Sequence, residues 1–241
     1  MNSIIWSALR GVRVALSAAT VSLIAVSAAS AQASKDCQQK SGDAAIAACT
    51  EAIRKNPTDA ILFYNRGNEY SAKGDNDRAI ADYNEAIRLD PKYAKAFNNR
   101  GDAYREKGDF DRALADYGSA IELMPDRAYY WSNRCWLLAK NNRELPRALS
   151  DCDRALQLSP NNDDYLDSRA LIYFRLGRFK EAIEDYNAAL KSEPNKAHYL
   201  FGRGLAKLKS GDTAGGEADL ADAKTADPKI AETFEKYGLK P

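Results

Sequence analysis

The sequence predicts an all-α protein, a right-handed α-solenoid of about six helix–turn–helix repeats of 34 residues with a C-terminal capping helix. Three patterns predict this fold class. Prolines recur at a nearly constant interval, small residues recur at the same interval, and the apolar residues of each unit lie three or four positions apart, as on one helical face. The proline interval is 34 residues except for one of 35, at Pro57, Pro91, Pro125, Pro160, Pro194 and Pro228.

Residues 1–33 have the layout of a secretory signal peptide. Two arginines precede an apolar stretch (residues 14–29), and small residues surround Ala31 and Ala33. The alternative is an uncleaved anchor, but several serines interrupt the stretch and leave it short for a bilayer span. We therefore expect cleavage after Ala31 or Ala33, no membrane insertion of the mature chain, and a periplasmic or secreted protein.

Six repeats account for almost all of the remaining chain. The first and last are expected to be atypical, because terminal units cap the stack instead of joining two neighbours. The fourth contains one extra residue. The expected ranges are 35–59, 60–93, 94–127, 128–162, 163–196 and 197–230, followed by a capping helix at 230–241.

Each expected repeat contains two helices joined by a tight turn. A glycine followed by an acceptor side chain, as in Gly74 and Asp75, ends one helix in the left-handed conformation and caps the next. Small residues such as Ala79 let the helix backbones approach, and Tyr83 fills the space around them. In the fourth repeat the extra residue lies in the turn at residues 140–146, where it leaves both helices in register.

The segments FNNRGDAY from Phe97 and ALADYGSA from Ala113, followed by Pro125, resemble the tetratricopeptide repeat. The resemblance extends over residues 35–230 and is strongest in repeats two to five. It implies a stack of helical hairpins whose first helices line a concave surface. It also implies a role in binding a peptide or a partner protein, as an exported bacterial member of the family.

Four cysteines lie in two of the expected hairpins. Four cysteines allow three pairings, but a rigid solenoid keeps the first and fourth repeats apart. We therefore expect disulfides between Cys37 and Cys49 and between Cys135 and Cys152, as is usual in exported proteins. The alternative is free, buried thiols that pack as small apolar groups.

An arginine column and an aspartate column follow the repeat interval. The arginines could bind an acidic ligand, but each could instead pair with the aspartate of its own hairpin. We favour the pairing because both columns share one period. The columns are Arg66, Arg100, Arg134, Arg169 and Arg203, and Asp82, Asp116, Asp151, Asp185 and Asp219.

Composition gives little support for catalysis or nucleic-acid binding. The chain has 35 Lys and Arg against 34 Asp and Glu, so it has no excess positive charge for a polyanion. His198 is the one imidazole, which leaves no catalytic triad or multi-histidine metal site, and we expect it on the surface. Asp163, Asp164 and Asp167 could act in acid–base chemistry or cation binding, but acidic residues in a first turn also complement the helix N-terminus. We expect no enzyme, no metal and no other cofactor.

The concave side offers a candidate binding surface on the first helices of repeats two to four. Asparagine side chains recur there at the repeat interval, and an amide can bind the backbone of an extended peptide. Resemblance to peptide-binding tetratricopeptide proteins supports this role, whereas the alternative is that the amides bond only to the neighbouring repeat. The candidate residues are Tyr64, Asn65, Asn68, Lys95, Asn98, Asn99, Asp102, Arg105, Tyr129, Asn133 and Trp136.

We therefore expect a protein-interaction scaffold that holds an extended peptide or a partner protein in its concave groove. An alternative is a structural component of a cell-envelope complex that docks through the C-terminal repeats. Phe201 and Leu205 make that end more apolar, so it could also receive the capping helix.

Overall fold

The computed structural model describes residues 32–240, and all regular secondary structure in this range is helical. The expected signal peptide, residues 1–33, falls almost entirely outside the described residues. Residues 32–39 are helical. The helices that follow are α2 (Gly42–Lys55), α3 (Ala60–Ala72), α4 (Asn76–Leu89), α5 (Ala94–Glu106), α6 (Phe110–Leu123), α7 (Ala128–Lys140), α8 (Leu145–Leu158), α9 (Asp163–Arg175), α10 (Phe179–Ala189), α11 (Ala197–Ser210), α12 (Thr213–Ala226) and α13 (Ile230–Lys236).

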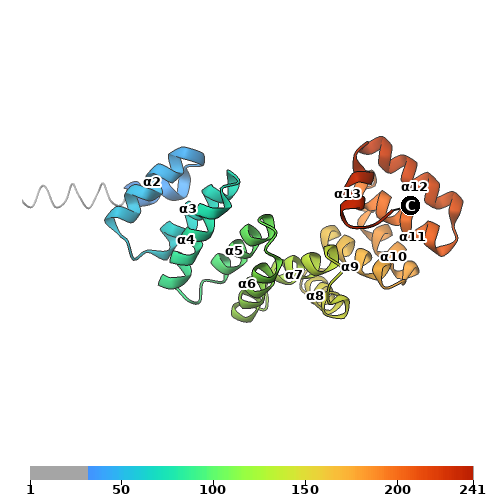
Figure 1. Ribbon diagram of the computed structural model, residues 1–241, viewed down its shortest axis with the longest axis horizontal. Helices are drawn as coiled ribbons and strands as arrows, with labels where there is room; N and C mark the ends of the chain where they lie inside the picture. The colour runs from blue at the N-terminus through green and yellow to red at the C-terminus, as the bar shows by residue number, and fades with distance from the viewer. Residues whose placement is uncertain (1–31, 241) are drawn as a thin grey trace, which may run out of the picture.

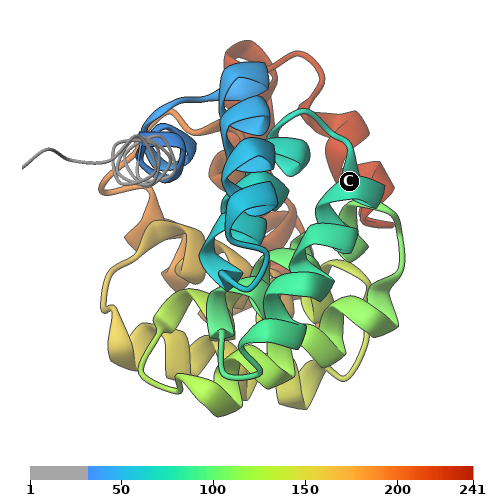
Figure 2. The ribbon, with the colours of Figure 1, turned by 90° about the vertical axis from the view of Figure 1, so that its left-hand side faces the viewer.

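The helices confirm the predicted α-solenoid. They pack most extensively in consecutive pairs, from α3 with α4 to α11 with α12, and each pair packs on the next. The first helices of neighbouring units also contact one another, as in α7 with α9. Figure 1 shows the resulting arc, and Figure 2 shows, from the N-terminal end, that the stack winds as a superhelix. Such an arc leaves the first helices on its inner, concave side.

Small residues set the spacing between the two helices of a unit. A Cβ on Gly67 would lie 2.7 Å from the ring of Tyr83, and one on Gly101 would lie 2.9 Å from the ring of Tyr117. Glycine at these positions therefore leaves the space that the large buried tyrosine ring needs in the core. In the fourth unit Cys135 and Cys152 occupy the equivalent two positions and form a disulfide, so a covalent bond replaces the contact of glycine with tyrosine.

The extra residue of the fourth unit is absorbed by the turn, as the sequence predicts. Helices α7 and α8 have 13 and 14 residues, the same lengths as α5 and α6. Asn142 and Glu144 instead adopt positive φ angles of 51° and 42°. Left-handed backbone at non-glycine residues is uncommon, so the turn accommodates the insertion without disturbing the helices.

The C-terminal segment folds back along the concave side. The Phe234 ring on α13 lies 4.6 Å from that of Phe201 on α11, measured between centroids. Beyond α13, Arg175 on α9 donates a hydrogen bond of 2.7 Å to the carbonyl of Tyr237, and Leu239 packs against side chains of α7 and α9. Figure 1 shows α13 on the inner side of the arc. In the described range, no helix has the length and apolar character needed to span a membrane.

Candidate functional site

Arginine and aspartate pair within five successive hairpins, which confirms the interpretation of the two columns as structural. Each guanidinium donates two hydrogen bonds to one carboxylate at N–O distances of 2.7–2.8 Å. All five aspartates are buried. These cations therefore hold the two helices together, and a ligand would have to break the pairs to use them. The pairs are Arg66–Asp82, Arg100–Asp116, Arg134–Asp151, Arg169–Asp185 and Arg203–Asp219.

The asparagine row bonds to neighbouring repeats. The Asn99 amide donates to Asn68 Oδ1 at 2.9 Å and to the Tyr64 hydroxyl at 3.1 Å. The Asn133 amide donates to Asn98 Oδ1 at 2.9 Å. Because these bonds connect α3 to α5 and α5 to α7, the row fixes the register of successive first helices.

Asp102 extends this polar network on α5. Its carboxylate accepts a hydrogen bond of 2.8 Å from the Tyr117 hydroxyl and one of 3.2 Å from the Asn98 amide. Burial raises the pKa of Asp102, while the nearby Arg105 guanidinium opposes the shift. The polar side chains of this network therefore bond mainly to one another and do not form an open row of donors.

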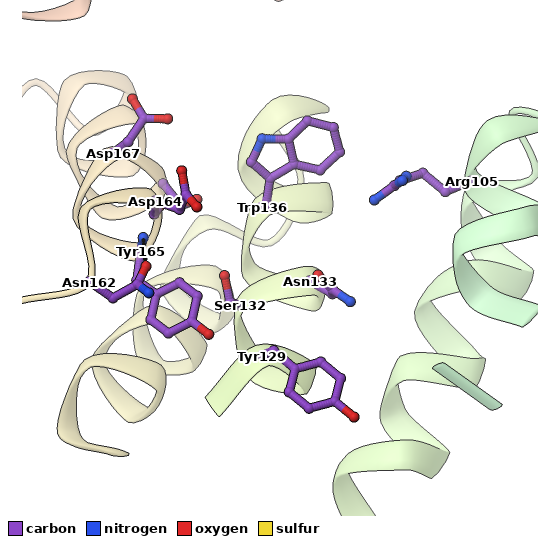
Figure 3. A pocket seen from close by; sticks show the side chains of 10 residues that line it. Arg105, Tyr129, Ser132, Asn133, Trp136, Asn162, Asp164, Tyr165 and Asp167 are labelled. Carbon is purple, nitrogen blue, oxygen red and sulfur yellow. Dashed lines mark hydrogen bonds between the residues drawn. The ribbon is translucent and has the colours of Figure 1, made fainter. Parts of the chain in front are cut away.

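An open pocket of about 530 Å³ lies on the concave side where α5, α7 and α9 face one another. Figure 3 shows the side chains of α7 and α9 on two neighbouring walls and Arg105 pointing in from α5. Three rings, from Tyr129, Tyr165 and Trp136, contribute to these walls. The complete lining is Arg105, Tyr129, Ser132, Asn133, Trp136, Asn162, Asp164, Tyr165, Asp167 and Ser168.

Most of the candidate binding residues from the sequence either line the pocket or take part in the polar network. Two do neither: Asn65 is half-buried on α3, and Lys95 is exposed on α5. The pocket is lined by Arg105, Tyr129, Asn133 and Trp136. The polar network contains Tyr64, Asn68, Asn98, Asn99 and Asp102.

The wall formed by α9 is acidic. Asp164 is exposed and accepts a hydrogen bond of 3.2 Å from the Tyr199 hydroxyl. Asp167, one turn later, is 9% exposed, and its Oδ1 has no hydrogen-bond partner among the described residues. Burial raises the pKa of Asp167, and His198 partly opposes this shift.

His198 is not the surface residue that the sequence suggests. Its side chain is 23% exposed, and its Nδ1 lies 3.5 Å from Asp167 Oδ2. The imidazole packs against the Phe234 ring at a centroid distance of 4.7 Å. Because α13 folds back over α11, it covers a residue that the repeat pattern alone would leave open.

Asn162 and Tyr165 also line the pocket, and they are not among the candidate residues that the sequence suggests. Asn162 is the N-cap of α9, and its side chain accepts a hydrogen bond of 3.1 Å from the Tyr165 amide. Tyr165 follows Asp164, so it lies on a different face of α9. Both residues lie in the opening turn of the fifth repeat, next to the candidate residues of the fourth repeat. That position in the repeat could have identified them.

Four cysteines form two disulfides in the structure, Cys37 with Cys49 and Cys135 with Cys152. This is the pairing that the sequence predicts. Between residues 32 and 240, no group of three or more His, Cys, Asp or Glu side chains is arranged to hold a metal ion.

Sequence models of one repeat family match four segments of the chain. A model described as "TPR repeat" matches residues 67–104. Models described as "Tetratricopeptide repeat" match residues 48–81, 94–127 and 137–200. No curated protein matches the chain.

Many solved structures share the fold. YrrB, described as a TPR protein with an unusual peptide-binding site, has a TM-score of 0.64 and 22% identity, covering 79% of this chain and 98% of YrrB. PilW, described as a widely conserved type IV pilus biogenesis factor, has a TM-score of 0.65 and 18% identity, with coverages of 73% and 86%. PilF of Pseudomonas aeruginosa has a TM-score of 0.70 and 16% identity, with coverages of 88% and 98%. At these identities the likeness concerns the fold alone.

Proposed function

Because the chain belongs to the tetratricopeptide repeat family, we propose that it is an interaction scaffold that holds an extended segment of a partner protein in its concave groove. The observation that carries this proposal is the open pocket between α5, α7 and α9. It combines aromatic walls with polar groups that can bond to a ligand, which is the usual composition of a recognition site.

The proposed groove runs along the first helices of successive repeats. At its N-terminal part the asparagine network forms a polar floor, and Asn133 joins that floor to the pocket. At its C-terminal part α13 and the following residues cover α11 and reach α9. A bound segment would therefore run over α3, α5 and α7 and end near α9.

Export to an oxidising compartment is the second element of the proposal. Two disulfides persist where thiols are not kept reduced, and the first 33 residues have the composition of a signal peptide. We propose a periplasmic or secreted protein. Amino-terminal sequencing of the protein from the periplasmic fraction should give a mature chain that begins at residue 32 or 34.

Binding without catalysis is the proposed mode of action. The arginines of the repeat column are held in ion pairs, and the four cysteines are held in disulfides. The pocket contains carboxylates and aromatic rings, which suit recognition. A turnover that persists through stringent purification would contradict this part of the proposal.

Site-specific photocrosslinking tests the location of the binding surface. A photoreactive phenylalanine analogue at Tyr129, which is 39% exposed in the pocket, should crosslink to a partner segment in intact cells. The same analogue at the exposed Glu122 on α6 is the control. Mass spectrometry should then identify the same peptide segment repeatedly at Tyr129, and equal crosslinking at Glu122 would contradict the proposal.

Docking of an envelope complex through the C-terminal repeats is less favoured by the geometry. Phe201 and Leu205 are 0% and 1% exposed, and Phe234 of the same chain packs against Phe201. A partner could reach this surface only after α13 had been displaced.

A further inference from the structure

Asp167 differs from the other buried aspartates of the described chain. Six aspartates there are buried, and five of them pair with an arginine of their own hairpin. Asp167 has no arginine partner in the described part of the chain: it lies 3.5 Å from His198, and its Oδ1 has no hydrogen-bond partner there. A buried carboxylate without a full set of partners is costly, so a role in the architecture does not explain it.

The repeat pattern does not require an acid at this position either. The equivalent residues of the other units are Tyr64, Asn98, Ser132 and Phe201. A carboxylate is therefore specific to the fifth repeat. It also lines the pocket, where Asp164 places a second carboxylate one turn earlier on the same wall.

Nearby cations do not neutralise this wall. Arg105, on the opposite side of the pocket, bonds to Glu106 at 2.8 Å and lies 3.2 Å from Asp102. Lys196 pairs with Glu193 at 2.9 Å. The exposed carboxylate of Asp164 therefore presents negative charge to the open pocket.

Aromatic rings line the remainder of the pocket. Tyr129 is 39% exposed, and Tyr165 extends from the acidic helix itself. Carboxylates beside aromatic faces suit a positively charged group, because the carboxylate accepts its N–H donors and the ring faces attract its charge. Arginine fits best, since its planar guanidinium can bond to a carboxylate and stack on a ring at once.

We propose that the pocket between α7 and α9 binds a cationic group of the partner segment, with Asp167 and Asp164 as its carboxylate acceptors. This inference rests on the proposed function for its partner. Arginine, lysine and a free amino terminus share the required chemistry, and the test below separates them.

The test uses small probes that need no knowledge of the partner. N-acetyl-arginine methylamide is titrated into the ¹⁵N-labelled protein, and the indole N–H of Trp136 reports on the pocket. Trp131, whose indole donates to the Pro125 carbonyl away from the pocket, is the internal control in the same spectrum. The citrulline analogue has nearly the same shape without the charge.

We expect a saturable shift of the Trp136 signal with the arginine probe and at least tenfold weaker binding of the citrulline probe. Asp167→Asn and Asp164→Asn should each reduce the arginine affinity about tenfold. Asp126→Asn, at an exposed position outside the pocket lining, should change it less than twofold. Equal binding of arginine and citrulline, an unchanged affinity of both pocket variants, or no response at Trp136 would overturn the inference.

Two further probes identify the source of the charge. N-acetyl-lysine methylamide represents a lysine side chain, and glycine methylamide represents a free amino terminus. The cationic probe of the three that binds most tightly identifies the group.

A separate array of blocked nonapeptides tests the proposed function. Peptides that bind without a basic residue would support a peptide-binding groove and overturn the inference about the cationic group. If the arginine probe binds and no peptide does, the inference about the cationic group would be supported and the proposed peptide-binding function would be contradicted.

Discussion

Asp167 is the residue at which burial and charge conflict most directly. Its pKa is raised from the ordinary 3.8, because burial disfavours the carboxylate and Asp163 and Asp164 add negative charge, while His198 and Lys196 oppose the shift. A carboxyl with a raised folded pKa binds its proton more tightly in the folded state than in the unfolded state. Ionisation of Asp167 therefore lowers the stability as the pH rises from 3.8 through the folded pKa.

Asp167→Asn should remove that penalty. We expect the variant to be more stable than the wild type by about 1–3 kcal/mol at neutral pH, because the neutral amide removes the buried charge and desolvation costs a charged group more than a neutral one. The difference should disappear as the pH falls below 3.8, where the carboxyl is protonated in both states. Urea unfolding from pH 3 to 8 measures it, with Asp126→Asn, at an exposed position that does not act on Asp167, as the control. A stability difference that is constant across this range would show that burial of charge is not the cause.

The structural ion pairs give a second prediction at the residue scale. Arg134→Met should destabilise the protein by about 3–5 kcal/mol, because it leaves the buried Asp151 carboxylate without its partner. Arg203→Met should cost less, since Lys207 lies 2.9 Å from the Asp219 carboxylate and can still pair with it. Urea unfolding of both variants provides the comparison. Equal losses would mean that the lysine does not replace the arginine.

At the scale of the elements, the first helical segment of the described chain depends on its disulfide. Residues 32–39 are helical, and the disulfide between Cys37 and Cys49 joins this segment covalently to α2. Replacing both cysteines by serine should cost about 2–4 kcal/mol and release this helix. Hydrogen exchange should then be faster at residues 32–39 and unchanged in α9–α12. Uniformly faster exchange along the whole chain would contradict this local role.

The disulfide between Cys135 and Cys152 provides the matched comparison. It joins α7 to α8, which also share the Arg134–Asp151 pair and a cluster of buried apolar side chains. Loss of this disulfide should therefore leave both helices folded, with a moderate rise in exchange centred on α7 and α8.

The elements that follow the repeat period could be predicted from the sequence. Spacing alone identified the hairpins, the Arg–Asp pairs and the turn that absorbs the insertion, because all of these follow from one repeated period. The partners of the Asn99 amide could not be predicted in this way. A period shows which residues share a face, but whether a side chain is free depends on contacts with the next repeat, here Asn68 and Tyr64.

At the scale of the whole molecule, the concave surface changes in character along the arc. Its N-terminal part is a satisfied amide network, its middle is the aromatic and acidic pocket, and its C-terminal part is covered by α13. The sequence predicted a capping helix from the apolar residues after the last repeat. It could not show that the tail turns back to Arg175, because that contact joins residues 62 positions apart and lies outside the repeat period.

Phe234 should control whether the C-terminal part of the concave surface is covered. Its ring is 1% exposed and packs on Phe201 and His198. Phe234→Glu would place a charge in this apolar contact, so α13 should detach and expose a contiguous apolar surface on α11. We expect concentration-dependent self-association in light scattering and faster hydrogen exchange in α13, with α3–α6 unchanged. Lys236→Glu, at an exposed position of the same helix, should remain monomeric if the wild type is monomeric. Should Phe234→Glu retain the wild-type exchange pattern and association state, α13 would owe its position to the Tyr237 and Leu239 contacts and not to the contact between the aromatic rings.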